Sequence, residues 1–359
     1  MDPAALREQF PVLERVVYLN AGTCGPLPRA AIAASAESAL KAAEEGRTMP
    51  YFERTKDVAA RLRAAYARRV GGRADDVALT TATSDGIVRV LLGLGLRRGD
   101  EVVTAEDEHP GLLGPLAAAE RVLGIRVVAA PFERVAEAAG PQTRLVACSH
   151  VNWCTGAVAP AELAEVGRRI PVLLDGAQGA GAVRVDVEAL GCAFYAAAGQ
   201  KWLCGPVGTG LLWVAPAWRE RMAVLTPTYL NLETPGDGLR AQPWPDARAL
   251  DTPALSPETM AGALAAHDVL DAFGWAQAHA RAISLADRLA RRLTGMGRTV
   301  SKRGETTLVA WEDRDAEAVA QRLVKAGIAL RHLPGGRHLR ASVGAWNDDA
   351  DLDRLLTAL

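Results

Sequence analysis

The sequence predicts an α/β fold in which helices cover a mostly parallel sheet and a smaller α+β domain follows. Between about 77 and 214, short β-rich runs alternate with Ala- and Leu-rich stretches, the order of strands and crossover helices in parallel sheets. Several runs are apolar throughout, as expected of strands buried on both faces. The length of 359 residues suits one large domain and one smaller domain.

The expected elements follow the chain in order. Strands are predicted at 77–82, 101–106, 125–131, 144–151, 171–177 and 208–214, with crossover helices at 113–122 and 161–169. The Pro- and Gly-rich passage 225–250 is expected to be a long loop, and loops of that length are often functional. One helix is expected from Pro257 to about Leu293, before an α+β tail. The predicted division is an N-terminal arm over 1–15, a large domain over 16–250, and a linking helix with a small C-terminal domain over 251–359.

Composition excludes several classes of protein. The net charge of −1 gives no basic excess to attract nucleic acid. No apolar run approaches the roughly 20 residues of a membrane helix, and the first residues lack a signal-peptide pattern. The five cysteines are scattered without a CxxC pair, so neither a disulfide framework nor a metal site is expected. We expect a cytoplasmic protein that binds neither nucleic acid nor membrane.

The strongest chemical signal is the pair LLDGAQ and GQKWLCGP, in which Lys201 follows Asp175 by 26 positions. An aspartate that ends a buried parallel strand points into the crevice where α/β proteins bind ligands. A buried carboxylate requires a cationic partner, and a protonated pyridine nitrogen is one. A lysine beside apolar Trp202 and Leu203 is desolvated and suited to forming a Schiff base. A helix-capping aspartate and a solvated lysine are the alternatives.

With these motifs the chain resembles the class V aminotransferase superfamily, which contains group II cysteine desulfurases, selenocysteine lyase, isopenicillin N epimerase and C–S lyases. The resemblance runs from YLNAGTCGPLP to LRASVGAWNDDADLDRLL. It implies the fold type I of pyridoxal-phosphate (PLP) enzymes, with PLP as cofactor and an α-amino acid as substrate. Lys201 matches the Schiff-base lysine, Asp175 the partner of the pyridine nitrogen, and Gln178 the residue that hydrogen-bonds the phenolic oxygen of the cofactor.

The resemblance also assigns the phosphate and ring contacts. Ala82, Thr83 and Ser84 in TTATSDGI match the turn that holds the phosphate, where a helix opens just after a strand; simple helix capping is the alternative. His109 in EDEHPGLL matches the histidine that stacks on the pyridine ring and relays protons, although a histidine before proline is more often a loop residue. Gln200 stands where relatives often have histidine and can still donate a hydrogen bond to the phosphate.

On the substrate side, Arg340 in HLRASVGAWN matches the arginine that binds the α-carboxylate, because a guanidinium fork holds a carboxylate in a fixed geometry. Trp153 stands where desulfurases tend to have asparagine, and it either lines the substrate side of the cofactor or belongs to the core. Thr23, in the NAGTCG segment, is the third residue expected to contact substrate. The stretch 327–340 lacks the nucleophilic cysteine that group II desulfurases carry there.

Three outcomes follow once Lys201 removes the Cα proton: transamination, β-elimination with C–S cleavage, or epimerisation. The missing loop cysteine argues against desulfuration through a protein-bound persulfide. A non-catalytic PLP-binding sensor and a Rossmann-type dehydrogenase are the remote alternatives. We expect a homodimer with shared active sites, in which Thr252 or Ser256 of DTPALSPET contacts the phosphate of the neighbouring subunit.

Overall fold

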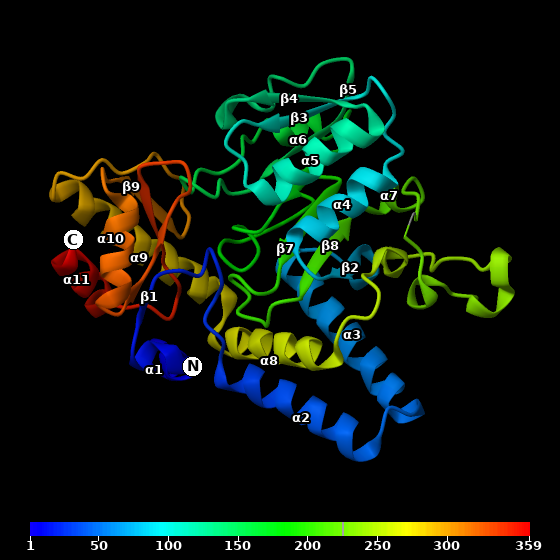
Figure 1. Ribbon diagram of the computed structural model, residues 1–359, viewed down its shortest axis with the longest axis horizontal. Coiled ribbons are helices and arrows are strands. Elements are labelled where there is room, and N and C mark those ends of the chain that lie inside the picture. Colours follow the sequence, from blue (N-terminus) through cyan, green and yellow to red (C-terminus); the bar gives the residue numbers. More distant parts are fainter. Residues whose placement is uncertain (225) are drawn as a thin grey trace.

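The computed structural model describes residues 1–224 and 226–359, and a seven-stranded sheet forms its centre (Figure 1). Leu225, the first residue of the expected loop over 225–250, lies outside the described residues. In spatial order the strands of the sheet are β2 (Val77–Thr80), β8 (Gly210–Val214), β7 (Phe194–Ala198), β6 (Val172–Asp175), β5 (Thr143–Ser149), β3 (Glu101–Ala105) and β4 (Arg126–Ala130).

The sheet is mostly parallel, as predicted. Neighbouring strands from β7 to β4 run parallel, whereas β8 runs antiparallel to both β2 and β7. Because β8 separates them, β2 points in the same direction as β7. The carboxyl ends of β2, β7, β6, β5 and β3 therefore meet at one edge of the sheet, which is where ligands bind in such folds.

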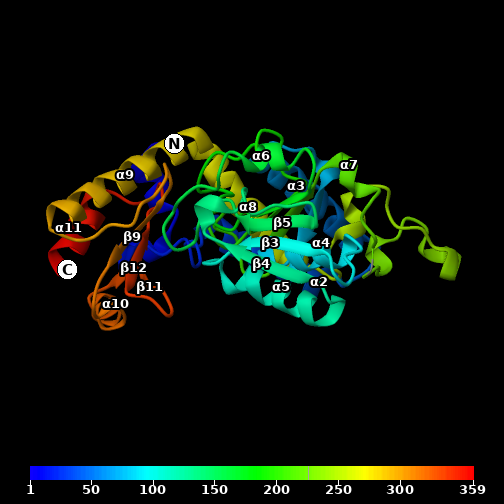
Figure 2. The same cartoon turned by 90° about the horizontal axis from the view of Figure 1, so that it is seen from above.

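Helices cover both faces of this sheet (Figure 2). On one face α4 (Thr83–Gly93) and α5 (Pro110–Leu123) pack against every second side chain of the strands. On the other face α3 (Met49–Val70) and the short α6 (Leu163–Val166) cover the alternate side chains. The helix expected over 161–169 is thus reduced to four residues, and turns form the rest of that stretch.

Strand β7 was missing from the expected strands. Its sequence, FYAAA, carries three alanines, which have a low β-propensity. All five residues are buried, and the strand lies between β6 and β8. Hydrogen bonding to two neighbours inside the core therefore decides its conformation, and local preference does not.

The single helix expected from Pro257 to about Leu293 is wrong. Two helices, α8 (Pro257–Phe273) and α9 (Trp275–Gly295), meet at Gly274, whose φ of 96° is unfavourable for residues with a side chain. Helix α8 packs against α2 (Arg29–Glu45) and α3 of the large layer, whereas α9 packs against the small sheet. The break at Gly274 lets the chain change direction between the large layer and the small sheet.

The C-terminal part forms a separate α+β layer. Its sheet contains β11 (Arg331–His332), β12 (His338–Ser342) and β9 (Leu308–Glu312), all antiparallel, with α9, α10 (Ala316–Lys325) and α11 (Asp349–Ala358) around it. The N-terminal segment adds β1 (Val17–Tyr18), which pairs with β10 (Ile328–Ala329), and α1 (Pro3–Glu8). Arg7 of α1 holds the carboxylate of Asp351 at 2.7 and 3.0 Å. This ion pair joins the two ends of the chain, although the apolar side chains of Leu6, Phe10 and Leu13 pack in the core of the large body.

The segment 226–250 contains three short 3-10 helices, η4 (Tyr229–Asn231), η5 (Pro235–Arg240) and η6 (Ala247–Leu250). Part of the segment projects from the body as an arm (Figure 1), whereas η6 is buried and packs against β2. The segment has no longer helix or strand of its own, in line with the expected loop. Among the helices that the structure describes, none is both long and apolar enough to cross a bilayer.

Three further histidines lie in the interior, with His150 and His267 buried and His279 half-buried. Burial lowers the pKa of His150, His267 and His279 from 6.5 to about 4 each. His150 lies 3.0 Å from the Tyr195 hydroxyl, and His267 lies 3.3 Å from an Asp271 carboxylate oxygen. These rings are therefore neutral in the folded protein at neutral pH, although an unfolded chain would protonate them near pH 6.5.

We expect acid to destabilise the protein before its carboxylates titrate. Since the folded pKa values of these histidines are depressed, their contribution to stability is complete above pH 6.5 and is lost as the pH falls towards 4. His267→Phe should make the free energy of unfolding fall less steeply between pH 6.5 and 4. Denaturant melts of both proteins across this range measure it, and equal slopes would contradict the assignment.

Candidate active site

The side chains singled out by the sequence gather at the carboxyl edge of the sheet. Asp175 ends β6, Lys201 lies in the turn after β7, and His109 caps α5 just after β3. Thr83 begins α4 directly after β2. The charges of Asp175, Arg340 and Arg331 all influence Lys201, so residues from both layers of the fold converge on this lysine.

Asp175 and Lys201 form the charged centre of the site. Asp175 is buried, and its carboxylate accepts one hydrogen bond, from the backbone N–H of Ala177 at 2.9 Å. Burial raises the pKa of Asp175, while Lys201 and the Ala177 N–H act in the opposite direction. Burial lowers the pKa of Lys201 to about 8, against the influence of Asp175. An amine with this pKa is partly neutral at physiological pH and can act as a nucleophile or a base.

Gln178 is fixed by two neighbours. Its Nε2 donates to the Gly22 carbonyl at 2.8 Å, and its Oε1 accepts from the Trp202 indole at 2.9 Å. One N–H of the amide is left over for a ligand. A Cβ on residue 22 would lie 2.9 Å from Gln178 Oε1 and 3.0 Å from Arg340 Nη2, so a larger residue at this position would force these side chains to move.

The N-terminal segment passes directly over Lys201. Gly25 donates its N–H to the Gln200 carbonyl at 2.8 Å, and a Cβ on residue 25 would lie 2.0 Å from the Lys201 carbonyl oxygen. Cys24 precedes this contact, is half-buried, and influences the charge on Lys201. Segment 20–25 therefore forms one wall of the site.

The N-terminus of α4 has the features of an anion site. Its N-cap, Ala82, offers no side-chain cap, so the first N–H groups of the helix are left to other partners. Two buried polar atoms beside the site, Thr83 Oγ1 and Gln200 Oε1, lack a hydrogen-bond partner within the described chain. Ser84 differs, because its hydroxyl donates to the Gly111 carbonyl at 2.8 Å. Ser84 could therefore donate a hydrogen bond to a phosphate from its backbone N–H but not from its hydroxyl.

His109 is held by its own helix. Its Nδ1 accepts the Gly111 N–H at 2.9 Å, so the proton of the neutral ring lies on Nε2. Burial, together with the charges of Lys201, Arg331 and Arg340, lowers the pKa of His109 to about 4. The ring meets Trp153 edge-on, with centroids 4.9 Å apart.

Arg340 is a buried cation of the site with few hydrogen-bond partners. It is 1% exposed, and its Nη1 donates to the Trp153 carbonyl at 2.6 Å. Its Nε and Nη2 have no hydrogen-bond partner in the described part of the chain. Burial, with Arg331 adding to the effect, lowers the pKa of Arg340 to about 10. A buried guanidinium with two unsatisfied nitrogens is costly unless an anion completes it.

The two remaining predicted substrate contacts lie close to these groups. Trp153 is 8% exposed, and its indole N–H donates to the Asp107 carbonyl at 2.8 Å. It thus belongs to the wall between His109 and Arg340. The Thr23 hydroxyl accepts a long hydrogen bond, 3.5 Å, from Arg331.

Sequence reasoning missed Arg331 and Glu108. Arg331 on β11 lies directly opposite Arg340 on β12, so both side chains leave the same face of the strand pair. Glu108 is buried and accepts the Ser149 N–H at 2.6 Å; burial raises its pKa to about 7 despite that bond. The position of Arg331, nine residues before Arg340 across a Pro-Gly-Gly turn, was the only signal for it in the sequence.

The residues chosen as donors to a neighbouring phosphate are occupied within their own chain. The Thr252 hydroxyl bonds the carboxylate of Asp85 and accepts from Arg89 at 3.2 Å. Ser256 caps α8, accepting the Thr259 N–H at 3.2 Å. Neither hydroxyl projects freely for a second subunit.

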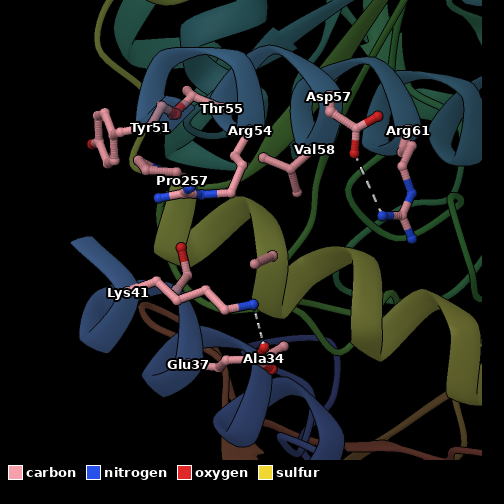
Figure 3. A pocket seen from close by; sticks show the side chains of 12 residues that line it. Ala34, Glu37, Lys41, Tyr51, Arg54, Thr55, Asp57, Val58, Arg61 and Pro257 are labelled. Carbon is pink, nitrogen blue, oxygen red and sulfur yellow. Dashed lines mark hydrogen bonds and ion pairs between the residues drawn. The ribbon is translucent and has the colours of Figure 1, made fainter. Parts of the chain in front are cut away.

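Among the described residues no group of three or more His, Cys, Asp or Glu side chains could hold a metal ion. A hollow between α2, α3 and the start of α8 lies apart from the edge with Lys201 (Figure 3). Its charges are already matched, as in Lys41 with Glu37 at 2.7 Å and Arg61 with Asp57 at 3.6 Å. These pairs are exposed and leave no unmatched group to bind a ligand.

The donor set at the sheet edge fits PLP, the cofactor that the resemblance implies. An uncapped helix N-terminus with the unpartnered hydroxyl of Thr83 suits a phosphate. The buried carboxylate of Asp175, with a single hydrogen bond, suits a protonated pyridine nitrogen. Lys201 suits covalent attachment of the aldehyde, and Gln178 has an N–H left for the phenolic oxygen.

Comparisons with known proteins agree with this geometry. The chain is 33% identical to isopenicillin N epimerase of Streptomyces clavuligerus over 60% of its length, but the match spans only 57% of that enzyme. It is 27% identical to cysteine desulfurase CsdA of Escherichia coli K12, covering 100% of this chain and 97% of CsdA. The solved complex of the cystine C–S lyase C-DES with its reaction product cysteine persulfide superimposes with a TM-score of 0.91 at 27% identity, covering 97% of this chain and 98% of C-DES.

A family model supplies the broadest match, since aminotransferase class V covers residues 16–355. Together with the fold and the donor set, it shows that the chain belongs to the class V aminotransferase family and is a PLP-dependent enzyme.

Proposed function

We propose that this enzyme cleaves the Cβ–S bond of a sulfur-containing α-amino acid by β-elimination, and that its substrate is a disulfide such as cystine. The observation that carries the proposal is the arginine pair beside Lys201, with Arg340 buried and Arg331 opposite it and nearer the surface. The buried fork suits the α-carboxylate next to the reacting carbon. Arg331 suits a second carboxylate, which cystine carries beyond its sulfur atoms.

The residues of the chain divide the work. Arg340 holds the α-carboxylate and so places the Cα hydrogen near Lys201, which takes that proton. When bound, PLP withdraws electrons from Cα, and Asp175 maintains the proton on its ring nitrogen. The Cβ–S bond then breaks, and the sulfur leaves with the bonding electrons. For cystine and one water the products are pyruvate, ammonia and cysteine persulfide.

Desulfuration through a protein persulfide is the competing route, and every thiol except that of Cys24, which lies in the wall over Lys201, argues against it. The stretch 327–340 contains no cysteine. Burial raises the pKa of Cys154 to about 12, so its thiol remains protonated and is a poor nucleophile. The thiols of Cys148, Cys192 and Cys204 are buried, and burial raises their pKa values. The likeness to C-DES supports release of a small-molecule persulfide.

Epimerisation is the second candidate, favoured by the similarity to isopenicillin N epimerase. It would begin with the same proton removal and end with protonation of Cα from the opposite face. The neutral His109, with its proton on Nε2, is a candidate donor for such a step. Detection of the opposite enantiomer among the products would favour this route.

We also propose a homodimer with shared active sites, and a division into an N-terminal arm over 1–15, a large domain over 16–250, and a linking helix with a small domain over 251–359. The segment 226–250 supports the dimer, because Tyr229, Leu230 and Leu239 expose apolar surface on it. The separate C-terminal core, built from residues of α9, α10, α11 and the small sheet, supports the division. The cytoplasmic location stays a prediction.

Analysis of the products distinguishes β-elimination from desulfuration through a protein persulfide. With cystine, we expect pyruvate and free persulfide in equal amounts, and no alanine. Cys24→Ser and Cys154→Ser should each leave turnover within a few-fold, because neither thiol carries sulfur. Mass spectrometry of the protein during turnover provides the control. Alanine as product, with sulfur bound to a cysteine whose replacement abolishes activity, would restore the desulfurase assignment.

Lys201→Ala should fold but lose the covalently held cofactor. The reason is that the side chain beside Asp175 with a lowered pKa is the attachment point. Borohydride treatment followed by peptide mass analysis should find the reduced cofactor on Lys201 in the unaltered protein and nowhere in the variant. A reduced cofactor still attached to the variant would show that another residue forms the bond.

The two arginines should differ in what they recognise. Arg340→Leu should weaken capture of cystine and of S-methylcysteine alike, since a buried charge pair that loses one partner typically costs about 2–5 kcal/mol. Arg331→Leu should raise KM for cystine by about tenfold, as expected of a half-exposed contact worth ~1.4 kcal/mol. It should leave KM for S-methylcysteine, which has one carboxylate, nearly unchanged. Equal effects of Arg331→Leu on both substrates would argue against a second carboxylate.

A further inference from the structure

Asn152 is a buried side chain beside the site whose function is not explained by any contact with cofactor or substrate. It is 1% exposed, and its amide makes four hydrogen bonds. Nδ2 donates to Asp107 Oδ2 at 2.7 Å. Oδ1 accepts the N–H groups of Cys154 and Thr155, both at 2.9 Å, and the Thr155 hydroxyl at 3.2 Å. The amide therefore closes the turn 152–156 and ties it to the loop before His109.

That turn presents Trp153 to both ends of the site. The Trp153 carbonyl accepts Nη1 of Arg340 at 2.6 Å, and its indole N–H donates to the Asp107 carbonyl at 2.8 Å. Its ring meets His109 edge-on at 4.9 Å between centroids. Arg340 has no other hydrogen bond among the described residues that would fix its plane. The orientation of the guanidinium thus depends on where the Trp153 carbonyl points.

We propose that Asn152 is a positioning residue that joins the two halves of the substrate site, by fixing the turn whose Trp153 carbonyl orients Arg340 and whose Trp153 ring lies against His109. Asp107 is its counterpart, since one residue receives both the Asn152 amide and the Trp153 indole. Arg340 comes from the small sheet, and His109 from the edge of the large one. The turn 152–156 therefore fixes the position of the Arg340 guanidinium relative to the ring of His109.

The inference rests on the proposed binding of an α-carboxylate by Arg340, and glycine tests it without any reaction. Glycine has the carboxylate but no β-substituent, so it cannot undergo β-elimination. Its Kd is read from the change in the absorption of the bound cofactor. Asn152→Ala should raise this Kd about tenfold, whereas kcat with cystine should change less than KM. In an Arg340→Leu background, Asn152→Ala should have no further effect on the Kd, because the oriented group is gone.

The donor and the acceptor of the hydrogen bond between Asn152 and Asp107 can be exchanged by mutation. Asn152→Asp alone sets two carboxylates against each other and should weaken glycine binding. Adding Asp107→Asn restores one amide donor and one carboxylate acceptor across the same 2.7 Å contact, and should recover most of the affinity. A purely structural role predicts recovery of thermal stability without recovery of the Kd, and that result would overturn the proposal.

Asn347 provides a matched control. It is fully buried and fixes a turn with a similar set of bonds, to the Gly344 N–H at 2.8 Å, the Tyr18 carbonyl at 3.2 Å and Asp351 at 2.9 Å. Asn347→Ala should lower the melting temperature as much as Asn152→Ala but leave the glycine Kd within twofold. An equal rise in Kd for both variants would show that general loosening explains the effect, and the positioning role would be wrong. If glycine bound the unaltered enzyme but cystine gave no pyruvate, the proposed reaction would fail while this test remained decisive.

Discussion

Three charged side chains, Asp175, Lys201 and Arg340, share a buried site in which the protein does not fully satisfy them. Among the residues that the structure describes, the side chain of Asp175 has one hydrogen-bond partner, and Arg340 has one for its three nitrogens. Burying charges costs several kcal/mol each unless partners replace the lost water. The sheet edge beneath the site and the glycine-containing segment 20–25 above it hold these side chains in place although their hydrogen bonding is incomplete. Ligands that carry a cationic ring, an aldehyde and a carboxylate supply what is missing.

The burial of these side chains also explains the altered acidities. Lys201 and Arg340 are both less basic than free side chains, and Asp175 is less acidic, because burial disfavours the charged form of each group. His109 remains neutral for the same reason, and because three cations surround it. A lysine that exchanges a proton near neutral pH, beside an imidazole with one fixed N–H, suits chemistry that begins by removing a proton from carbon.

Much of the fold could be predicted from the sequence, because the strands rich in Val and Leu are buried on both faces and are recognisable without the tertiary structure. Strand β7 could not, since its alanines carry little local preference. The break at Gly274 was missed because the helical pattern continues on both sides of a single glycine.

In the site, Asp175 and Lys201 could be predicted from their strand position and spacing. The roles of His109, Gln178 and Arg340 came from the family resemblance. Arg331 and Asn152 depend on strand pairing and turn geometry, which distant contacts decide.

The wall over Lys201 has a consequence for the order in which the protein is made. Lys201 and Asp175 belong to a sheet that is complete once β8 has been synthesised, whereas Arg340 and Arg331 come from the last strands of the chain. Segment 20–25, which contacts the Lys201 turn, follows β1, and β1 pairs with β10, which is translated much later. Domains fold as units during synthesis, the N-terminal one first. A nascent chain therefore carries the sheet edge with Asp175 and Lys201 before Arg331 and Arg340 have been synthesised, so the two halves of the site meet only after the last strands are made.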